Sequence, residues 1–204
     1  MSDPSDGAVT GGGLRARSKA RRRDLIQRTA MRLFAERGYD ETTVADVAEA
    51  AEVAPRTVSG YFPSKLELAT AFADDLATRL TASFRSRPDA DLLDLLDQWL
   101  VAVTDSLDPE LARLALAMYR TNPGLGALGS AHLTESAELG AAAIAARVGL
   151  PVDHPMIAVR GATIGATLGE YLKAIATGDD VAGLRESVLA YLGAVLAPAA
   201  ADVT

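Results

Sequence analysis

The chain has 204 residues, a net charge of −7 and no cysteine. The lack of cysteine excludes disulfides and thiolate chemistry and fits a cytoplasmic location. Hydrophobic residues make up 49% of the chain, which excludes global disorder, yet no apolar run reaches the roughly 18 residues that span a bilayer. Alanine and leucine dominate, so we predict an all-α protein with no membrane partner.

The charge is unevenly distributed along the chain. Residues 1–66 carry 11 Lys or Arg and 9 Asp or Glu, a net of +2, whereas the remainder carries a net of −9. Eight basic residues and one acid fall within 14–34. A local basic patch can steer a protein toward phosphates despite an acidic total, so a nucleic-acid partner stays open for the N-terminal part.

Helical periodicity and capping signals predict nine or ten helices and no strand. Residues 1–18 are expected to be a disordered tail with a basic arm, followed by a helix over 19–36 that ends at Gly38. Thr43 and Asp46 resemble a capping box at the start of the second predicted helix. Ser64 and Glu67 form the same pattern at the start of the fourth predicted helix. Further helices are predicted over 55–61, 91–107, from 109, and over 128–148, 155–177 and 181–196, with a break at Asn122-Pro123-Gly124.

The second and third helices share a tight turn at Glu52 and Val53 and form a helix-turn-helix. Their apolar residues point at one small core, predicted to contain Val47, Ala48, Val53, Val58 and Phe62. That core leaves one face of the third helix free to enter a DNA major groove, with Arg56, Thr57, Ser59, Gly60 and Tyr61 on or near it. Arginine can bond guanine bidentately, and a glycine allows DNA to approach closely.

The segment "LFAERGYDETTVADVAEAAEVAPRTVSGYFPSK" resembles the TetR/AcrR family of transcriptional regulators, over about residues 21–68. The resemblance implies a helix-turn-helix DNA-binding domain at 19–65 and a helical effector-binding and dimerisation domain at 66–204. It implies a homodimeric repressor that a small molecule releases from a double-stranded DNA operator. It further implies DNA contacts by Thr43, Arg56, Thr57, Ser59, Gly60, Tyr61 and Lys65, of which Thr43 and Lys65 contact phosphates.

Three positions depart from the family pattern. Glu52 stands where the family has glycine in the turn, so a positive φ there would be strained. Ala54 stands where serine is common, which leaves the third helix with a weak cap. Ser59-Gly60 replaces an aromatic pair, so the operator sequence cannot be carried over from the family.

The part beyond residue 68 is predicted to hold a pocket for a small hydrophobic effector. Its candidate lining residues, each of which could instead be ordinary core, are Phe84, Leu96, Trp99, Met118, Tyr119, His132 and Met156. The segment "MYRTNPGLGALGSAHLTESAELGAAAIAARVGL" faintly resembles regulators with acyl-CoA-like effectors, which makes such a thioester one option.

Three glycines at a spacing of four, Gly161, Gly165 and Gly169, lie on one face of the helix predicted over 155–177. Each costs about 1 kcal/mol inside a helix, so close approach of another group is expected to compensate. The second subunit of a homodimer is the preferred partner, and a helix of the same chain or a ligand is the alternative.

Other functions fit the sequence less well. No nucleophile elbow, phosphate-binding glycine loop or His-Glu metal motif supports an enzyme, and no cofactor is expected. Asp91, Asp94 and Asp97 recur every three residues, but no cysteine or nearby histidine supports a metal site, and a solvated helix face explains them. An architectural DNA-binding protein is disfavoured by the acidic C-terminal half, and a plain helical hairpin is the structural alternative for the helix-turn-helix.

Overall fold

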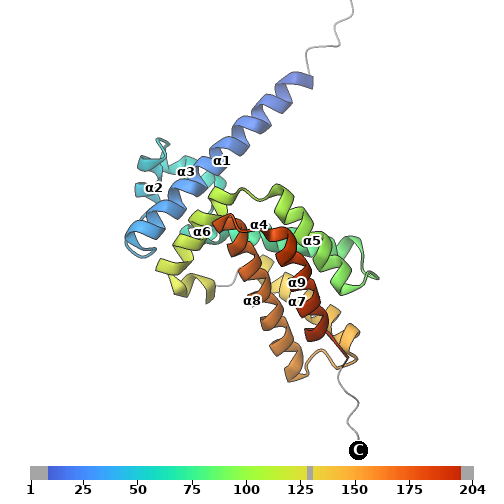
Figure 1. Cartoon of the computed structure of the whole chain (residues 1–204). Coiled ribbons are helices and arrows are strands. Elements are labelled where there is room, and N and C mark those ends of the chain that lie inside the picture. The colour runs from blue at the N-terminus through green and yellow to red at the C-terminus, as the bar shows by residue number, and fades with distance from the viewer. Residues whose placement is uncertain (1–8, 128–130, 199–204) are drawn as a thin grey trace, which may run out of the picture. The chain divides into compact units, whose positions relative to one another are not determined.

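A computed structural model describes residues 9–127 and 131–198 of the chain. Within these residues the backbone forms α-helices and one short 3₁₀ helix but no strand, which confirms the all-α prediction (Figure 1). The elements are α1 (Val9–Arg37), α2 (Val44–Ala50), α3 (Pro55–Tyr61), α4 (Lys65–Ser86), α5 (Leu92–Ser106), α6 (Pro109–Thr121), η1 (Pro123–Ala127), α7 (Ala131–Val148), α8 (Pro155–Thr177) and α9 (Val181–Val195).

The chain divides into two compact units. The N-terminal unit comprises Met1–Ala71 together with Ala117–Leu125, and the C-terminal unit comprises Phe72–Leu116 together with Gly126–Thr204. Two helices, α4 and α6, therefore begin in one unit and end in the other.

The core of the N-terminal unit forms where α1, α2 and α3 meet. Ile26, Ala30 and Phe34 of α1 recur every four residues on one face and are fully buried. Burying a side chain as large as Phe34 stabilises a fold by about 1.5–3 kcal/mol. The other helices add Val47, Ala48, Val58 and Phe62, all buried as predicted, while Val53 is half-buried.

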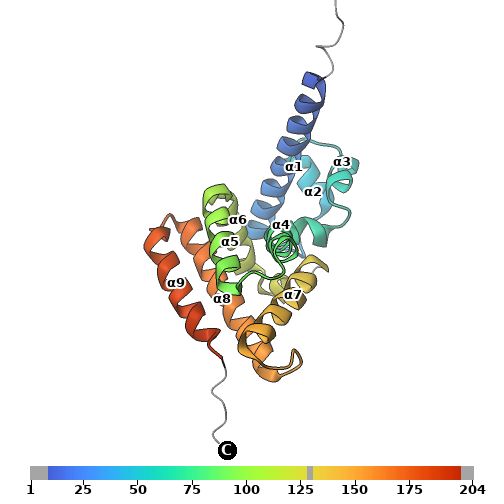
Figure 2. The ribbon, with the colours of Figure 1, turned by 90° about the vertical axis from the view of Figure 1, so that its right-hand side faces the viewer.

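The first helix begins ten residues earlier than the pattern predicted, at Val9 rather than Lys19. Its N-terminal part extends past α2 and α3 (Figures 1 and 2). Arginine, lysine, alanine and leucine are strong helix formers, so the basic stretch 14–23 continues the helix despite the glycines that precede it. The predicted disorder of residues 1–8 lies outside the described residues.

The C-terminal unit is a bundle in which α8 packs against α7 and α9, and α5 packs against α7 and α9. Figure 1 shows α8 and α9 side by side. A partly buried hydrogen bond of 2.8 Å joins the Thr104 hydroxyl of α5 to the Tyr171 hydroxyl of α8. Among the described residues, none of the helices is both long enough and apolar enough to cross a membrane.

Candidate functional site

The start of α2 carries the predicted capping box. The backbone N–H of Asp46 donates to the Thr43 hydroxyl at 3.1 Å, and the Thr43 N–H donates to the Asp46 carboxylate at 2.7 Å. The Thr43 hydroxyl also donates to that carboxylate at 2.6 Å. The hydrogen bond from the Thr43 hydroxyl, and after it the bond from the Thr43 N–H, lowers the pKa of Asp46 below its ordinary value. The capping box therefore stabilises the fold fully at pH values above the ordinary carboxyl pKa. This stabilisation is lost as the pH falls through the lowered pKa of Asp46. The single hydrogen of the Thr43 hydroxyl is already donated to Asp46. This hydroxyl could therefore donate to a DNA phosphate only if its bond to the Asp46 carboxylate broke.

The turn after α2 has the hydrogen bonds of a Schellman motif. The N–H of Val53 donates to the Ala48 carbonyl at 2.9 Å, and the N–H of Glu52 donates to the Glu49 carbonyl at 3.0 Å. This geometry places Glu52 at φ +53°, the only positive φ among the described non-glycine residues. The turn therefore keeps its shape without glycine, at the strain expected from the sequence.

Replacing Glu52 by glycine is expected to stabilise the protein by about 1 kcal/mol, because glycine adopts a positive φ without a Cβ clash. Urea unfolding of the full chain measures the change. Glu49→Gly is the matched control, since Glu49 is exposed inside α2 and its replacement should instead destabilise by about 1 kcal/mol. A loss of stability in Glu52→Gly would show that the left-handed turn does not form in solution.

The third helix presents most of its predicted DNA-contacting side chains to solvent. Arg56, Ser59 and Gly60 are exposed, and Thr57 and Tyr61 are half-buried at the edge of that face. A Cβ placed on Gly60 would meet no atom within 4 Å, so packing does not require glycine there. Ala54 makes no side-chain cap hydrogen bond, which confirms that α3 is weakly capped.

Lys65, at the start of α4, contacts the turn between α1 and α2. Its ammonium lies 4.2 Å from the centroid of the Tyr39 ring and 3.4 Å from the Asp40 carbonyl oxygen. Burial, followed by the nearby Asp40 carboxylate, raises the pKa of Tyr39 above its ordinary value, so the ring stays neutral beneath the cation. The arrangement holds Lys65 against the turn between α1 and α2, and its predicted phosphate contact stays a prediction.

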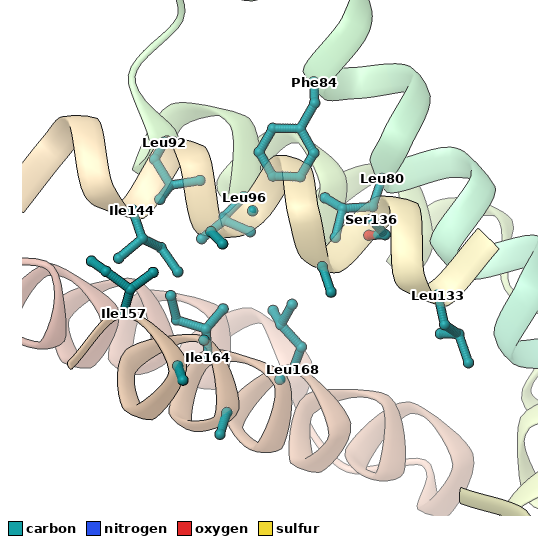
Figure 3. A pocket seen from close by; sticks show the side chains of 17 residues that line it. Leu80, Phe84, Leu92, Leu96, Leu133, Ser136, Ile144, Ile157, Ile164 and Leu168 are labelled. Carbon is teal, nitrogen blue, oxygen red and sulfur yellow. The ribbon is translucent and has the colours of Figure 1, made fainter. Parts of the chain in front are cut away.

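The C-terminal unit contains an apolar cavity of about 430 Å³ between α4, α5, α7 and α8. The rings and chains of Phe84, Leu96 and Ile164 surround this space in Figure 3. Among the described residues that line it, Ser136 supplies the single polar side chain and none is charged. Its lining is Leu80, Phe84, Leu92, Leu96, Leu133, Ser136, Ala137, Gly140, Ala141, Ile144, Ile157, Ala158, Gly161, Ala162, Ile164, Gly165 and Leu168.

Two of the seven predicted pocket residues, Phe84 and Leu96, line this cavity. The other described ones do not: Trp99 is buried away from its lining, Met156 is exposed at the start of α8, and Met118 and Tyr119 belong to the N-terminal unit. The side chain of His132 lies outside those that the structure describes. The cavity combines leucine, isoleucine and phenylalanine side chains with glycine and alanine on α7 and α8, and the predicted set contained none of these small residues.

The glycine series of α8 divides between two surroundings. Gly161 and Gly165 line the cavity, and a Cβ on Gly161 would lie 3.9 Å from Ile144 Cδ1 of α7. Gly169 is exposed and does not line it. Gly161 thus faces a helix of the same chain and the cavity, and Gly165 faces the cavity, where a Cβ would meet no atom within 4 Å. The predicted dimer contact of the three glycines stays a prediction.

Two of the three regularly spaced aspartates, Asp91 at the start of α5 and Asp97 within it, have separate structural roles. Asp91 caps α5 by accepting the N–H of Leu93 at 2.8 Å and forms an ion pair with Arg147. Asp97 forms an ion pair with Arg185 of α9 at 2.7 Å. No group of three potential metal-ligating side chains occurs among the described residues.

Comparison with known proteins identifies the N-terminal part of the chain. Residues 26–72 match the model of bacterial regulatory proteins of the tetR family. Over 78 residues, 38% of this chain, the sequence is 42% identical to the HTH-type transcriptional regulator TcmR of Streptomyces glaucescens. That match spans 34% of TcmR, so it covers about a third of the relative's length.

Solved structures extend the similarity in fold to nearly the whole chain. Thermus thermophilus FadR, a TetR-family repressor in complex with lauroyl-CoA, is 21% identical with a TM-score of 0.54, covering 89% of this chain and 98% of its own. Salmonella enterica GusR is 23% identical with a TM-score of 0.55, covering 86% and 95%. TcmR and FadR are both transcriptional regulators, the class of protein that the sequence predicted. Residues 26–72 are therefore a DNA-binding domain of the tetR family of bacterial regulatory proteins, and the chain shares the all-helical fold of solved TetR-family regulators.

Proposed function

We propose that the chain is a cytoplasmic, homodimeric transcriptional repressor that binds a DNA operator through α3 and is released by a small apolar effector. The observation that carries the DNA-binding part is the exposed face of α3, with Arg56, Ser59 and Gly60 open to solvent within the region of the family match. The basic N-terminal part of α1 supports it, because Arg15, Lys19 and the neighbouring exposed arginines add positive charge to the same unit.

The apolar cavity supports the effector part of the proposal. Its volume lies in the range of about 300–1,000 Å³ that is usual for small-molecule sites. A lining with one hydroxyl and no charge favours a neutral, apolar group over a charged one, since burying an unpaired charge is costly. An acyl chain meets this requirement, and lauroyl-CoA, which Thermus thermophilus FadR binds, is the first probe to use.

Lauroyl-CoA is expected to raise the melting temperature of the protein and to weaken its binding to an operator selected from random DNA duplexes. Lauric acid tests whether the acyl chain alone has these effects, and coenzyme A without an acyl chain should have none. Gly140→Leu should abolish the rise in melting temperature, because Gly140 lines the cavity. A Cβ there meets no atom within 4 Å, so the leucine side chain can enter the space that the ligand would occupy.

Ala142→Leu is the matched control, since Ala142 is exposed two residues along the same helix and does not line the cavity. It should respond to lauroyl-CoA as the wild type does. An equal response in Gly140→Leu would place the ligand elsewhere, and no response in any variant would remove acyl chains from the candidate effectors.

A further inference from the structure

We propose that Asn122 is a positioning residue for DNA binding, which fastens the end of α6 to the corner between α1 and α2. The inference rests on the proposed function, since it concerns how strongly the DNA-binding unit holds an operator. Asn122 belongs to the Asn122-Pro123-Gly124 break between helices, and the sequence pattern gave this break no role beyond ending a helix.

The side chain of Asn122 makes three hydrogen bonds, two of them to residues more than 80 positions away. Its Nδ2 donates to the Phe34 carbonyl at 2.8 Å and to the Met118 carbonyl at 2.8 Å. Its Oδ1 accepts the N–H of Tyr39 at 2.6 Å. Phe34 and Met118 lie in the last turns of α1 and α6, and each carbonyl also accepts a backbone N–H, Phe34 from Gly38 at 3.1 Å and Met118 from Asn122 at 3.0 Å. One amide group therefore adds a second hydrogen bond at the end of each helix and joins the two ends.

Only an amide supplies this combination of groups. An asparagine side chain offers two N–H donors and one carbonyl acceptor on adjacent atoms. Aspartate keeps the acceptor for Tyr39 but has no donor for the two carbonyls, and alanine loses all three bonds. The residue type at this position is thus specified by the two helix ends that it joins.

The corner held by Asn122 carries residues of the proposed DNA interface. The ring of Tyr39 packs 5.4 Å from that of Phe34 and supports the ammonium of Lys65. The Thr42 hydroxyl donates to the Gly38 carbonyl at 2.8 Å, and the next residue, Thr43, caps α2. A displaced corner would therefore move both Lys65 and the start of α2.

The position of Asn122 in the chain makes this contact sensitive to the C-terminal unit. Helix α6 begins at Pro109 in the C-terminal unit, ends at Thr121 in the N-terminal unit, and is followed directly by Asn122. An α-helix transmits a shift along its axis, and hydrogen bonds weaken steeply once donor and acceptor separate beyond about 3.5 Å. A movement of the end of α6 by about 1 Å relative to the corner would thus break the bonds from Asn122 to Phe34 and Tyr39, while the bond to Met118 of the same helix would remain.

Asn122→Ala is expected to weaken binding to the selected operator about tenfold and to speed amide exchange at Tyr39. Asn122→Asp, which retains the acceptor for Tyr39, should have a smaller effect on that exchange. Thr121→Ala is the control, because Thr121 is exposed and its hydroxyl bonds to the Ala117 carbonyl of its own helix. Measurements are made well below the unfolding midpoint of each variant, so that general loss of stability does not reduce binding.

Unchanged operator binding in Asn122→Ala, or weaker binding with unchanged exchange at Tyr39, would overturn the inference. The coupling is then measured with lauroyl-CoA, whose effect on operator binding should fall to under about twofold in Asn122→Ala while its affinity for the free protein is unchanged. Release of the operator as strong as in the wild type would contradict the coupling. Failure of lauroyl-CoA on the wild type would count against the proposed effector alone, since the first two measurements need no ligand.

Discussion

Replacing Arg56 by alanine is expected to weaken binding to the selected operator by about 10- to 100-fold, as the loss of a base contact costs about 1–3 kcal/mol. Arg56 is exposed in the first turn of α3, on the face that we propose enters the major groove. Its removal leaves no cavity in the core, so the melting temperature should not change. Fluorescence anisotropy with a labelled operator measures the affinity.

The control for this substitution is Arg113→Ala, which removes the same charge from an exposed site on the part of α6 in the C-terminal unit. It should leave operator binding within about twofold of the wild type, since screened charges act weakly at a distance. Binding to unrelated DNA separates two roles of Arg56, because a base contact is lost on the operator alone and a phosphate contact is lost on all sequences. Equal weakening by both substitutions would falsify a direct role of Arg56.

The helix ends could be predicted from the sequence because they depend on local chemistry. Thr43 with Asp46 and the weak cap at Ala54 are each determined within four residues. The strained Glu52 was also predictable, because a Schellman turn needs a positive φ whichever residue occupies it. The start of α1 was missed, since glycine-rich sequence before the basic stretch suggested a tail rather than a helix.

The cavity and the Asn122 contacts could not be predicted, because both depend on segments that are distant in the sequence. A pattern shows that Ala137, Gly140 and Gly161 are small, but not that α7 and α8 bring them to the lining of one cavity. The sequence indicated only that Asn122 ends a helix. Its bonds to Phe34 and Tyr39 span 88 and 83 positions, which no local pattern reveals. A polar side chain at the end of a helix is a general signal for hydrogen bonds to the backbone, although it does not indicate which distant residue accepts or donates them.

The exposed side of α8 and α9 is apolar enough to bury in a homodimer. Val159 is 53% exposed on α8 and Tyr191 is 51% exposed on α9, the helix that packs against it. Small exposed residues accompany them on these two helices, namely Ala166, Gly169, Ala190 and Ala194. Small residues allow two helix pairs to approach closely, and this favours the outward faces of α8 and α9 as the dimer interface.

Tyr191→Glu is therefore expected to convert the dimer to a chain of 21.2 kDa in sedimentation velocity, because burying an unpaired carboxylate in an apolar interface costs several kcal/mol. Operator binding should fall more than 100-fold, since a dimer places two recognition helices on half-sites about 34 Å apart. Val101→Glu adds the same charge at an apolar position of α5 that is 38% exposed, and it should leave both mass and binding unchanged. Tyr191→Phe should remain dimeric, which separates the added charge from the loss of the ring. A dimeric Tyr191→Glu protein would exclude this face, and a monomeric Val101→Glu protein would place the interface on α5 instead.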